Sequence, residues 1–464
     1  MNLSGRRALV VGLGKSGVAA CRLLAAKGAR VAATDEKPEA ALSASLAQLE
    51  GAPLEKLFAG GISAQAFVGR DLVVVSPGVP LALPPIAAAL GDGIELIGEA
   101  ELAARFIEEP VLGITGTNGK STTTALTGHL LASAGRKVFV GGNLGNALSN
   151  RVVDPALGAL DATVAELSSF QLEAVSRLRC SAACVLNVTP DHLDRYPSLE
   201  AYADAKARIF ANQGAGDAAV LNLRDARVRS MKTQPLVARR GFDPAAAASG
   251  ERAAAAAADD LDGAPPAALA IGPRGLRVNG LDFQLRAKTL RGTHNAENAL
   301  AALLLALHLD ARPEDLQRGL DTYPGLPHRL EPVRVLDGVE WVNDSKATNV
   351  DSVEKSLSAF AQGVILLMGG RGKGAPYAPL RPLFPGRVKA LLTVGEDGPR
   401  IARELGDLAE VTACGDLATA CAAARRLARG GDTVLLSPAC ASYDQFKNFE
   451  ERGERFKGFV RGMS

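Results

Sequence analysis

The stretch Gly-Ile-Thr-Gly-Thr-Asn-Gly-Lys-Ser-Thr occupies residues 113–122 and runs into the helix-forming sequence TTTALTGHLLASAG at 122–135. Glycines between a strand and a helix let backbone N–H groups converge on phosphate oxygens, and the helix N-terminus adds positive potential. Lys120 can reach β- and γ-phosphates, and the Ser121 hydroxyl can bind Mg²⁺. The stretch therefore predicts a phosphate-binding loop for a nucleoside triphosphate.

One residue departs from the usual phosphate-loop pattern G-x-x-x-x-G-K-[ST], because Ile114 stands at the position of the first glycine. The alternative interpretation is a glycine-rich turn in which Lys120 occurs by chance. A strand-like run, a helix-like run and the sequence Gly-Lys-Ser-Thr occur together here, which favours the nucleotide interpretation.

Short apolar runs alternate with Ala- and Leu-rich stretches along nearly the whole chain. Continuous apolar runs predict parallel sheets that are covered by helices. The pattern restarts at the phosphate loop and again after the proline-containing stretch at 322–333. We therefore predict an α/β protein with three domains. A Rossmann-like domain occupies residues 1–98, a central P-loop ATPase-type domain with a parallel sheet occupies 99–324, and a C-terminal Rossmann-like domain occupies 325–464.

Composition excludes several classes of protein. The chain has 464 residues, of which 47% are hydrophobic, and this excludes disorder, coiled coil and collagen. The 52 basic and 50 acidic residues give a net charge of +2, which argues against nucleic acid as the main partner. The six cysteines form no C-x-x-C pair, and no apolar run has the length of a membrane span. We predict reduced, buried cysteines, a cytoplasmic location and no membrane insertion.

A second glycine-rich stretch lies near the N-terminus. Gly12, Gly14 and Gly17 follow the apolar run RALVV, and Asp35 ends the next run. This spacing is typical of a dinucleotide-binding fold, in which the acid binds a ribose. The stretch alone fits an NAD(P)-dependent dehydrogenase, a nucleotide-diphosphate substrate or a purely structural turn. Nothing else in the sequence indicates hydride transfer, and residues 76–78 (Ser-Pro-Gly) could close the same site.

The central region supplies possible metal ligands. Glu166 follows the run ATVA, His192 lies in NVTPDHLDRY, and Lys206 lies in the predicted helix YADAKARIF. A carboxylate and an imidazole at strand ends beside a phosphate loop can hold a second Mg²⁺. The alternative for His192 is an ordinary loop histidine.

The third region carries three small or polar clusters, each after an apolar run: Asn343–Asn349, Gly369–Gly374 and Ser437–Ser442. Lysines and hydroxyl groups at these positions suit an anionic amino acid or a phosphate. Three ordinary strand-to-helix turns are the alternative.

Several motifs together resemble one known family. GITGTNGKST, DHLDRY, GTHNAENALAA, LPHRLE, NDSKATN and SPACASYDQFKNFEERG resemble the Mur ligases of peptidoglycan synthesis. The resemblance runs from about residue 5 to residue 460, and GLGKSG, ELSSFQLE and DQFKNFEERG are most similar to the members that use D-glutamate. Folylpolyglutamate synthases have a similar phosphate loop but lack the N-terminal glycine-rich domain. A P-loop switch or an ATPase without ligase chemistry is the remaining alternative.

The resemblance implies an ATP-dependent reaction in which D-glutamate is added to UDP-N-acetylmuramoyl-L-alanine through an acyl phosphate. It implies two Mg²⁺ ions, with Ser121 and Glu166 on one ion and His192 and Lys206 on the other. Carbamylation would turn Lys206 into a carboxylate-like ligand. Together with Lys120, the residues Glu166, His192 and Lys206 are the implied catalytic residues.

The resemblance also assigns residues to three binding subsites. The ATP residues are Gly116, Thr117, Asn118, Gly119, Lys120, Ser121, Thr122, Asn295, Asn298, Arg329 and Asp344. The UDP-substrate residues are Gly14, Lys15, Ser16, Thr34, Asp35, Glu36, Ser76, Gly78, Asn143 and Ser168. The glutamate residues are Thr348, Lys373, Ser442, Tyr443 and Phe449. Tyr443 stands where we expect a leucine, so the shape and polarity of the glutamate pocket can differ from those of other members.

Three further expectations complete the sequence-based description. We expect a monomer, and we expect closure of the domains because ATP and glutamate residues lie on separate predicted domains. The Ala-rich segment 244–269 is interpreted as a peripheral part of the central domain. The preference for D- or L-glutamate stays open at this stage.

Overall fold

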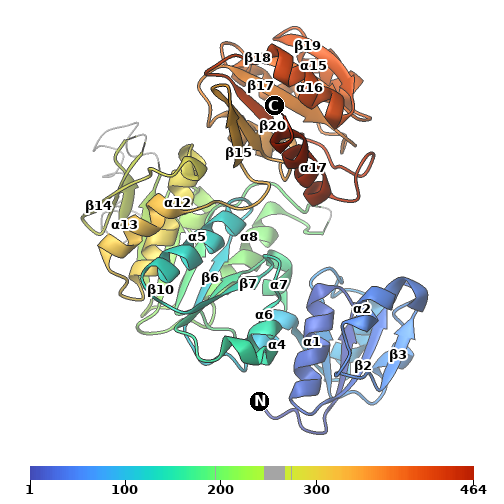
Figure 1. Ribbon diagram of the computed structural model, residues 1–464. Coiled ribbons are helices and arrows are strands. Elements are labelled where there is room, and N and C mark those ends of the chain that lie inside the picture. The colour runs from blue at the N-terminus through green and yellow to red at the C-terminus, as the bar shows by residue number, and fades with distance from the viewer. Residues whose placement is uncertain (194, 245–266, 273, 464) are drawn as a thin grey trace. The chain divides into compact units, whose positions relative to one another are not determined.

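A computed structural model describes residues 1–193, 195–244, 267–272 and 274–463 of the chain. The interpretation of the Ala-rich segment falls mostly on residues 245–266, which lie outside the described residues. The structure contains three β-sheets (Figure 1). It divides into two compact units, of which one contains Met1–Phe283 and Glu297–Gly319 and the other contains Gln284–Ala296 and Leu320–Ser464.

The N-terminal sheet is parallel and has the strand order β3-β2-β1-β4-β5. Its strands are β1 (Arg7–Val11), β2 (Arg30–Asp35), β3 (Lys56–Ala59), β4 (Leu72–Val75) and β5 (Glu95–Gly98). Its helices are α1 (Lys15–Ala26), α2 (Ser43–Ala47), α3 (Pro84–Gly91) and α4 (Glu99–Ala104), with short helices η1 (Glu39–Leu42) and η2 (Ala64–Phe67). The chain order reverses at β1, so the C-terminal ends of β1 and β4 flank the crevice where such sheets bind ligands.

The central sheet has the order β14-β13-β12-β11-β10-β9-β6-β8-β7. Its strands are β6 (Val111–Thr115), β7 (Val138–Gly142), β8 (Ala162–Glu166), β9 (Ala182–Val185), β10 (Ala218–Asn222), β11 (Ala238–Asp243), β12 (Ala268–Ala270), β13 (Gly275–Val278) and β14 (Leu281–Gln284). The α-helices that accompany it are α5 (Lys120–Ser133), α6 (Leu148–Val153), α7 (Ser169–Glu173), α8 (Leu199–Ala207), α9 (Ala226–Arg229), α12 (Thr293–Leu307) and α13 (Pro313–Thr322). The short helices are η3 (Pro155–Leu157), η4 (Arg208–Phe210) and η5 (Lys288–Leu290). β6 is an inner strand between β8 and β9, which places the phosphate loop at the middle of the sheet.

The C-terminal sheet has the order β15-β16-β20-β17-β18-β19. Its strands are β15 (Glu331–Leu336), β16 (Val339–Asn343), β17 (Val364–Gly369), β18 (Val388–Val394), β19 (Glu410–Gly415) and β20 (Thr433–Leu436). Its helices are α14 (Val350–Leu357), α15 (Gly398–Leu405), α16 (Leu417–Leu427), α17 (Phe449–Arg461) and the short helix η6 (Ala378–Leu383).

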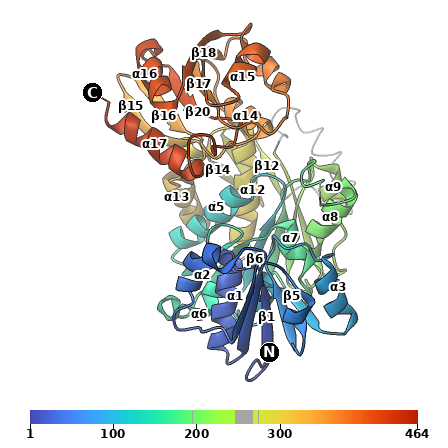
Figure 2. The same ribbon diagram turned by 90° about the vertical axis from the view of Figure 1, so that its right-hand side faces the viewer.

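Helices cover both faces of this C-terminal sheet (Figure 2). Leu366 and Met368 of β17 belong to a core that also contains residues of α14 and α15, whereas Ile365 and Leu367 belong to a core with α16 and α17. The unbroken apolar run of β17 is thereby explained, because both faces of the strand are buried. The predicted α/β class with mostly parallel sheets is confirmed.

The sheets are not entirely parallel, because the central and C-terminal sheets each contain an antiparallel pair. β15 and β16 pair antiparallel, as do β12 and β13. The two-residue turn Asp337–Gly338 joins β15 to β16, and both residues have positive φ angles of 50° and 75°. Asp-Gly between apolar runs is a hairpin signal, so this pair was readable from the sequence. Asn279–Gly280 joins the neighbouring strands β13 and β14 in the same way.

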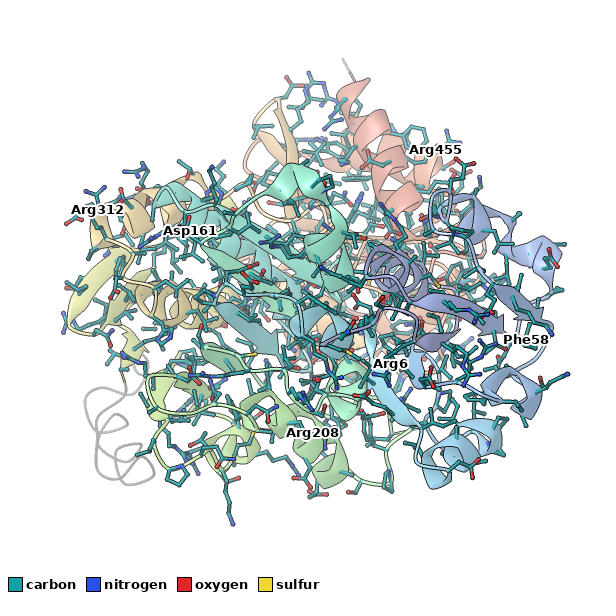
Figure 3. The ribbon with its side chains drawn as sticks, turned by 90° about the horizontal axis from the view of Figure 1, so that it is seen from below. Arg6, Phe58, Asp161, Arg208, Arg312 and Arg455 are labelled. Carbon is teal, nitrogen blue, oxygen red and sulfur yellow. The ribbon has the colours of Figure 1, made fainter. Side chains whose placement is uncertain are left out.

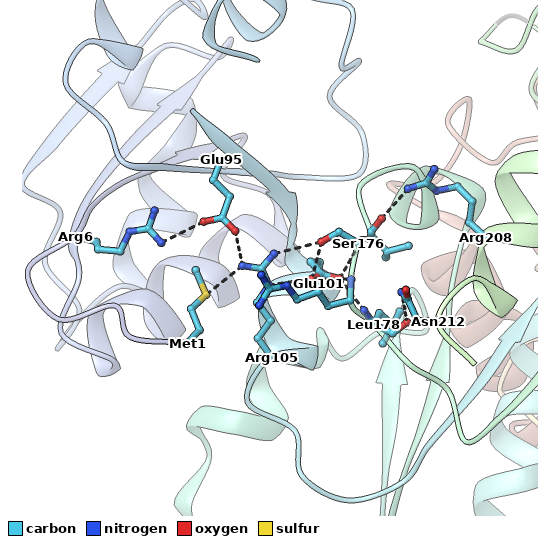
Figure 4. A network of polar contacts seen from close by, with 11 residues as sticks. Met1, Arg6, Glu95, Glu101, Arg105, Ser176, Leu178, Arg208 and Asn212 are labelled. Carbon is cyan, nitrogen blue, oxygen red and sulfur yellow. Dashed lines mark hydrogen bonds and ion pairs between the residues drawn. The ribbon is translucent and has the colours of Figure 1, made fainter. Parts of the chain in front are cut away.

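The buried carboxylate of Glu101 in α4 ties the segment after the N-terminal sheet to the central domain (Figure 4). Its oxygens accept hydrogen bonds from the backbone N–H groups of Ser176, Arg177 and Leu178 at 2.9–3.1 Å and from Arg105 Nε at 2.9 Å. Burial alone would raise the pKa of Glu101, but these donors outweigh it and lower the pKa. The contact joins α4 to residues 176–178 through a carboxylate that stays charged.

The six cysteines are all buried and unpaired, which confirms that part of the sequence-based prediction. Charged side chains such as Arg312 and Arg455 lie on the outside (Figure 3). Among the described residues, no helix combines the length and the apolar character that crossing a bilayer requires.

Candidate active site

The phosphate loop connects β6 to α5 and holds the amine of Lys120. Gly116 and Gly119 have φ angles of 151° and 84°, which glycine adopts without strain. Lys120 Nζ donates to the carbonyl oxygens of Gly116 and Thr117, both at 2.8 Å. Helix α5 begins at Lys120, and the N–H groups of its first turn have no acceptor within the helix. The loop therefore combines backbone donors and a cation, as phosphate binding requires.

Three residues that the sequence analysis did not assign hold this loop in place. Asn187 follows β9, and its side-chain oxygen accepts the N–H of Asn118 at 2.8 Å. The Asn187 side chain donates in turn to Glu297 Oε1 at 3.1 Å, and Asn222 donates to the same oxygen at 3.1 Å. The loop conformation thus depends on residues from β10 and α12 as well as on its own glycines.

Asn298, a predicted ATP residue, lies against the start of α5. Its Oδ1 accepts the hydroxyl of Thr123 at 3.2 Å. A Cβ atom placed on Gly119 would lie 2.4 Å from the same oxygen, which only glycine avoids. Asn298 and the phosphate loop are therefore packed directly together.

Lys206 of α8 shares an acceptor with Lys120. Its Nζ donates to the Gly116 carbonyl at 3.0 Å and lies 4.2 Å from the centre of the Tyr202 ring. The side chain is 1% exposed. Burial and the positive charge of Lys120 lower the pKa of Lys206 from 10.5 to about 6, against a small opposite effect of Asp191. Lys206 is therefore a largely neutral amine at pH 7.

Glu166 ends β8 and is joined to Asn143 after β7. Asn143 Nδ2 donates to Glu166 Oε1 at 2.7 Å, and the Asn143 N–H donates to the Glu166 carbonyl at 2.8 Å. The second carboxylate oxygen, Oε2, is buried and has no hydrogen-bond partner among the described residues. Close approach is possible because Gly142 is opposite Glu166, where a Cβ would lie 2.2 Å from the Glu166 carbonyl. The structure brings these two predicted residues together.

His192 lies on an exposed loop with a positive φ of 54°. Its ring packs on Phe170, with 4.8 Å between ring centres, and its Nε2 lies 3.6 Å from Asp191 Oδ2. The same Phe170 ring also contacts Arg195, whose guanidinium lies 4.0 Å from the ring centre. The imidazole thus packs against the Phe170 ring in a tilted arrangement, and its side chain stays exposed.

The contacts of the predicted metal ligands show which of their oxygen atoms could bind a cation. Within the described ranges, no three side chains among His, Cys, Asp and Glu converge as a metal site. The buried, unpartnered oxygen of Glu166 is an atom that a bound cation would satisfy, and Ser121 lies in the first turn of α5. These oxygens are the hard ligands that Mg²⁺ prefers. The residues on the Glu166 side fit a magnesium ion.

The N-terminal loop is formed where β1 and β4 end. Ser76 Oγ donates to the Gly12 carbonyl at 2.7 Å, and Gly12 has a φ of 87°. A Cβ on Gly17 would lie 1.8 Å from the Gly12 carbonyl, so α1 can approach the loop only with glycine there. Gly14 is the N-cap of α1 and has open space around it. The predicted UDP-substrate residues Gly14 and Ser76 thus lie on the two sides of one crevice.

Asp35 and Thr34 use their side chains within the N-terminal sheet. The Asp35 carboxylate accepts the N–H groups of Leu13 at 2.6 Å and Lys37 at 2.9 Å. The buried Thr34 hydroxyl donates to the Gly61 carbonyl at 3.2 Å. Both predicted UDP-substrate residues therefore use their side chains to hold neighbouring loops of this domain. The other predicted UDP-substrate residues of this sheet lie at the surface or are half-buried: Lys15, Ser16, Glu36 and Gly78.

A cleft in the compact unit that contains Met1–Phe283 is lined by residues of both the N-terminal and the central domain. Ser76, Pro77 and Glu99 line one side, and Phe170 and Arg195 line the other. Arg195 Nη1 donates across the cleft to the Pro77 carbonyl at 3.2 Å. The predicted residue Ser168 caps α7 nearby, where its hydroxyl accepts the N–H of Gln171.

The remaining predicted ATP residues belong to the other compact unit. Asp344 is buried, and its carboxylate accepts the N–H of Leu330 at 3.1 Å and the hydroxyl of Ser437 at 2.8 Å. Burial raises the pKa of Asp344 to about 6. Arg329 is half-buried with an unpartnered Nε. The amide of Asn295 donates within its own segment, to the carbonyl of Arg291 at 2.9 Å.

The predicted glutamate residues lie on loops at one end of the C-terminal sheet. Thr348 follows β16, Lys373 follows β17, and Ser442 follows β20, and these three strands are neighbours. Lys373 is exposed, whereas Ser442 is buried. Tyr443 is 66% exposed, and Phe449 begins α17.

Three family models match the chain. They are the Mur ligase MurD-like N-terminal domain at residues 6–98, the Mur ligase middle domain at 114–306 and the Mur ligase glutamate ligase domain at 328–440. A UDP-N-acetylmuramoylalanine--D-glutamate ligase of Anaeromyxobacter dehalogenans is 57% identical over 98% of this chain and 97% of the relative. The protein of the same name from Myxococcus xanthus is 53% identical over 99% of each chain. The chain belongs to the Mur ligase family.

Solved structures support the fold of this Mur ligase. MurF ligase from Thermotoga maritima in complex with ADP has a TM-score of 0.61 at 15% identity and covers 99% of this chain and 96% of its own. UDP-N-acetylmuramate-alanine ligase MurC from the same organism has a TM-score of 0.59 at 19% identity, covering 98% and 99%. The three-domain α/β architecture of the family is therefore present here.

The residues that the sequence analysis missed in this Mur ligase are those that support others. Glu297 lies within the GTHNAENALAA motif, but its partners Asn187 and Asn222 come from two other segments. Asn187 opens the quoted stretch NVTPDHLDRY, two residues after the buried strand β9, and its signal was that of a polar residue near a strand end. That signal is too common in α/β sheets to select one residue.

Proposed function

We propose that this Mur ligase joins the alanyl carboxyl group of UDP-N-acetylmuramoyl-L-alanine to the amine of D-glutamate, with conversion of ATP to ADP and phosphate. The observation that carries the proposal is the meeting of Lys120 and Lys206 on one carbonyl of the phosphate loop. The names of the relatives, together with their coverage of the full chain, support the choice of substrates.

The chemistry requires activation of the carboxylate, because a carboxylate is a poor acyl donor. An oxygen of the alanyl carboxylate attacks the γ-phosphorus of ATP, the bond to the bridging oxygen breaks, and ADP leaves. The neutral amine of glutamate then attacks the acyl carbon, a proton is lost, and phosphate leaves as the amide forms. Anions meet in both steps, so positioned cations and backbone donors lower the barrier without a covalent enzyme group. Lys120 supplies one such cation.

Two Mg²⁺ ions are part of the proposal. Ser121 and Glu166 would hold one ion, and His192 with a modified Lys206 would hold the other. When bound, Mg²⁺ neutralises charge on the phosphates. The buried free oxygen of Glu166 supports the first assignment.

Carbamylation of Lys206 is part of the proposal, and the neutral state of its amine supports it. The amine nitrogen attacks the carbon of CO₂, a C–N bond forms, and one proton leaves to solvent, which produces an anionic carbamate. Only an unprotonated amine has the lone pair for this step, and the lowered pKa of Lys206 supplies it at pH 7. A carbamate beside Lys120 would place a negative charge next to the Lys120 cation, an attraction that the neutral amine does not supply.

The substrate subsites stay as the sequence analysis assigned them. The crevice around Gly14 and Ser76 would bind the UDP portion, and Asn143 and Ser168 would lie near the muramoyl-alanine. Asn295 and Asn298 would lie near the adenine, with Arg329 and Asp344 on ATP. The domain limits at 98/99 and 324/325 are part of this proposal. So is closure on binding, for which scattering profiles that do not change with nucleotide and substrate would be contrary evidence.

The deciding experiment measures phosphate release from ATP with UDP-N-acetylmuramoyl-L-alanine and either D-glutamate, L-glutamate or no amino acid. Release that requires both the UDP substrate and D-glutamate is the expected result. A requirement for L-glutamate would keep the mechanism and revise the pocket. Release that depends on neither substrate would leave an ATPase. Sedimentation of the same sample tests the proposed monomer, and fractionation tests the proposed cytoplasmic location.

A further inference from the structure

The loop that carries Lys373 is fixed at both ends, and Tyr377 forms one of these ends. At its start, Arg371 and Ala441 exchange two backbone hydrogen bonds of 2.9 and 3.0 Å. At its end, the buried Tyr377 donates its hydroxyl hydrogen to Asp397 Oδ2 at 2.5 Å. The same hydroxyl lies 3.1 Å from Cys440 Sγ. Lys373 is exposed and lies in the loop between these two fixed ends.

Asp397 transmits this contact to the loop. Its N–H donates to the Gly370 carbonyl at 2.9 Å, and a Cβ placed on Gly372 would lie 2.0 Å from Asp397 Oδ2. The carboxylate therefore lies directly against the residue that precedes Lys373. Arg400 closes the other side, since its guanidinium donates to the Ala375 carbonyl at 3.0 Å.

Cys440 connects the same hydroxyl to the other predicted glutamate residues. Cys440 lies two residues before Ser442, and its neighbour Ala439 donates its N–H to the Ala347 carbonyl at 2.9 Å, directly before Thr348. The segments that carry Thr348, Lys373 and Ser442 thus meet around residues 439–441. Tyr377, which follows Lys373 in the same loop, contacts this region through its hydroxyl and Cys440 Sγ.

We propose that Tyr377 is a positioning residue for the amino-acid acceptor, because its hydroxyl holds the Lys373 loop, through Asp397 and Cys440, against the segment of Ser442. The inference rests on the proposed glutamate site. It assigns a role in acceptor affinity to a side chain that does not touch the acceptor. The aromatic ring fills the core in either case, so the hydroxyl alone is the element under test.

The test compares Tyr377→Phe with the wild-type enzyme in steady-state kinetics. We expect the KM for D-glutamate to rise about tenfold, the size of one lost hydrogen bond to a charged group. The KM values for ATP and for the UDP substrate should stay within about twofold, as should kcat. Asp397→Ala should raise the same KM, and the double variant should add little, because both changes remove the same hydrogen bond. Additive effects, or an unchanged KM for D-glutamate, would overturn the proposal.

Two further variants separate the possible causes. Phe384→Leu loosens the same core without touching the loop, and it should lower the melting temperature without changing the KM for D-glutamate. An equal KM increase in Phe384→Leu would show general destabilisation and would overturn the inference. Lys373→Ala tests the site itself. If Lys373→Ala raises the KM and Tyr377→Phe does not, only the role of Tyr377 falls. If Lys373→Ala has no effect, the proposed glutamate site and this inference fall together.

Discussion

The two glycine-rich loops of this protein have similar backbones and different surroundings. Each follows a buried strand and begins a helix, α1 in one case and α5 in the other. In the N-terminal loop the fixing contacts come from Asp35 and Ser76, and the lysine of the loop, Lys15, is exposed. In the central loop two buried or half-buried lysines, Lys120 and Lys206, donate to one carbonyl. The two loops therefore share a backbone pattern that suits phosphate binding, and the paired lysine side chains distinguish the central loop from the N-terminal one.

The largest difference between the loops should appear on removal of their lysines. We expect Lys206→Ala to lower kcat/KM by about a thousandfold or more, because the side chain that would carry the negatively charged carbamate beside the phosphate loop is lost. Lys15→Ala should change only the KM for the UDP substrate, by less than about tenfold, since Lys15 is exposed. Partial rescue of Lys206→Ala by short carboxylic acids would support the carbamate. A fully active Lys206→Ala enzyme would remove Lys206 from the site.

Glycine substitutions test the close contacts within the N-terminal loop. Gly17→Ala places a Cβ 1.8 Å from the Gly12 carbonyl, whereas Gly14→Ala meets nothing within 4 Å. We expect Gly17→Ala to lower the free energy of unfolding by about 3 kcal/mol and Gly14→Ala to change it by less than about 0.5 kcal/mol. Urea unfolding of the three proteins measures this. Equal losses in both variants would contradict the close approach of α1 to the loop.

The pH dependence of stability tests the neutral state of Lys206. Between about pH 6, its pKa in the folded protein, and its ordinary pKa of 10.5, the unfolded chain binds a proton that the folded protein does not. The unfolding free energy should therefore rise with pH in this window, by at most about 1.4 kcal/mol per pH unit. Unfolding of wild type and Lys206→Met in CO₂-free buffer from pH 6.5 to 9.5 tests it. Lys206→Met should lack this contribution, and parallel curves would contradict the lowered pKa.

The smallest expected effect concerns the hydroxyl that closes the N-terminal loop. Ser76→Ala removes one hydrogen bond to the Gly12 carbonyl and should cost about 1 kcal/mol of stability. The KM for the UDP substrate should rise by less than about threefold, and the KM for ATP should not change. Ser43→Ala, at an exposed position in the same domain, is the matched control. A rise in the KM for ATP would show that the two loops are coupled.

Much of the fold could be predicted because its strands are continuous apolar runs. β1, β6 and β17 were recognised in this way, as was the position of each glycine-rich loop. The antiparallel pairs were missed, although Asp337–Gly338 carries a hairpin signal, because β15 has a mixed burial pattern and reads as a proline-interrupted connection. The candidate site was predicted from motifs that are contiguous in sequence. Its supporting residues, such as Asn187 and Tyr377, lie outside those motifs or bind partners far along the chain.

The sequence by itself determined the class of this protein: the α/β alternation, the phosphate loop and the membership of its family all follow from contiguous residues. Only the tertiary structure determined the charge state of Lys206 and the contacts of Tyr377. Lys206 is neutral because folding buries it and brings it, together with Lys120, to the carbonyl of Gly116. Gly116 lies 90 positions before Lys206 in the sequence. Tyr377 and Cys440 meet although 63 positions separate them. Charge state and loop position depend on distances through space, and spacing along a single sequence does not contain them.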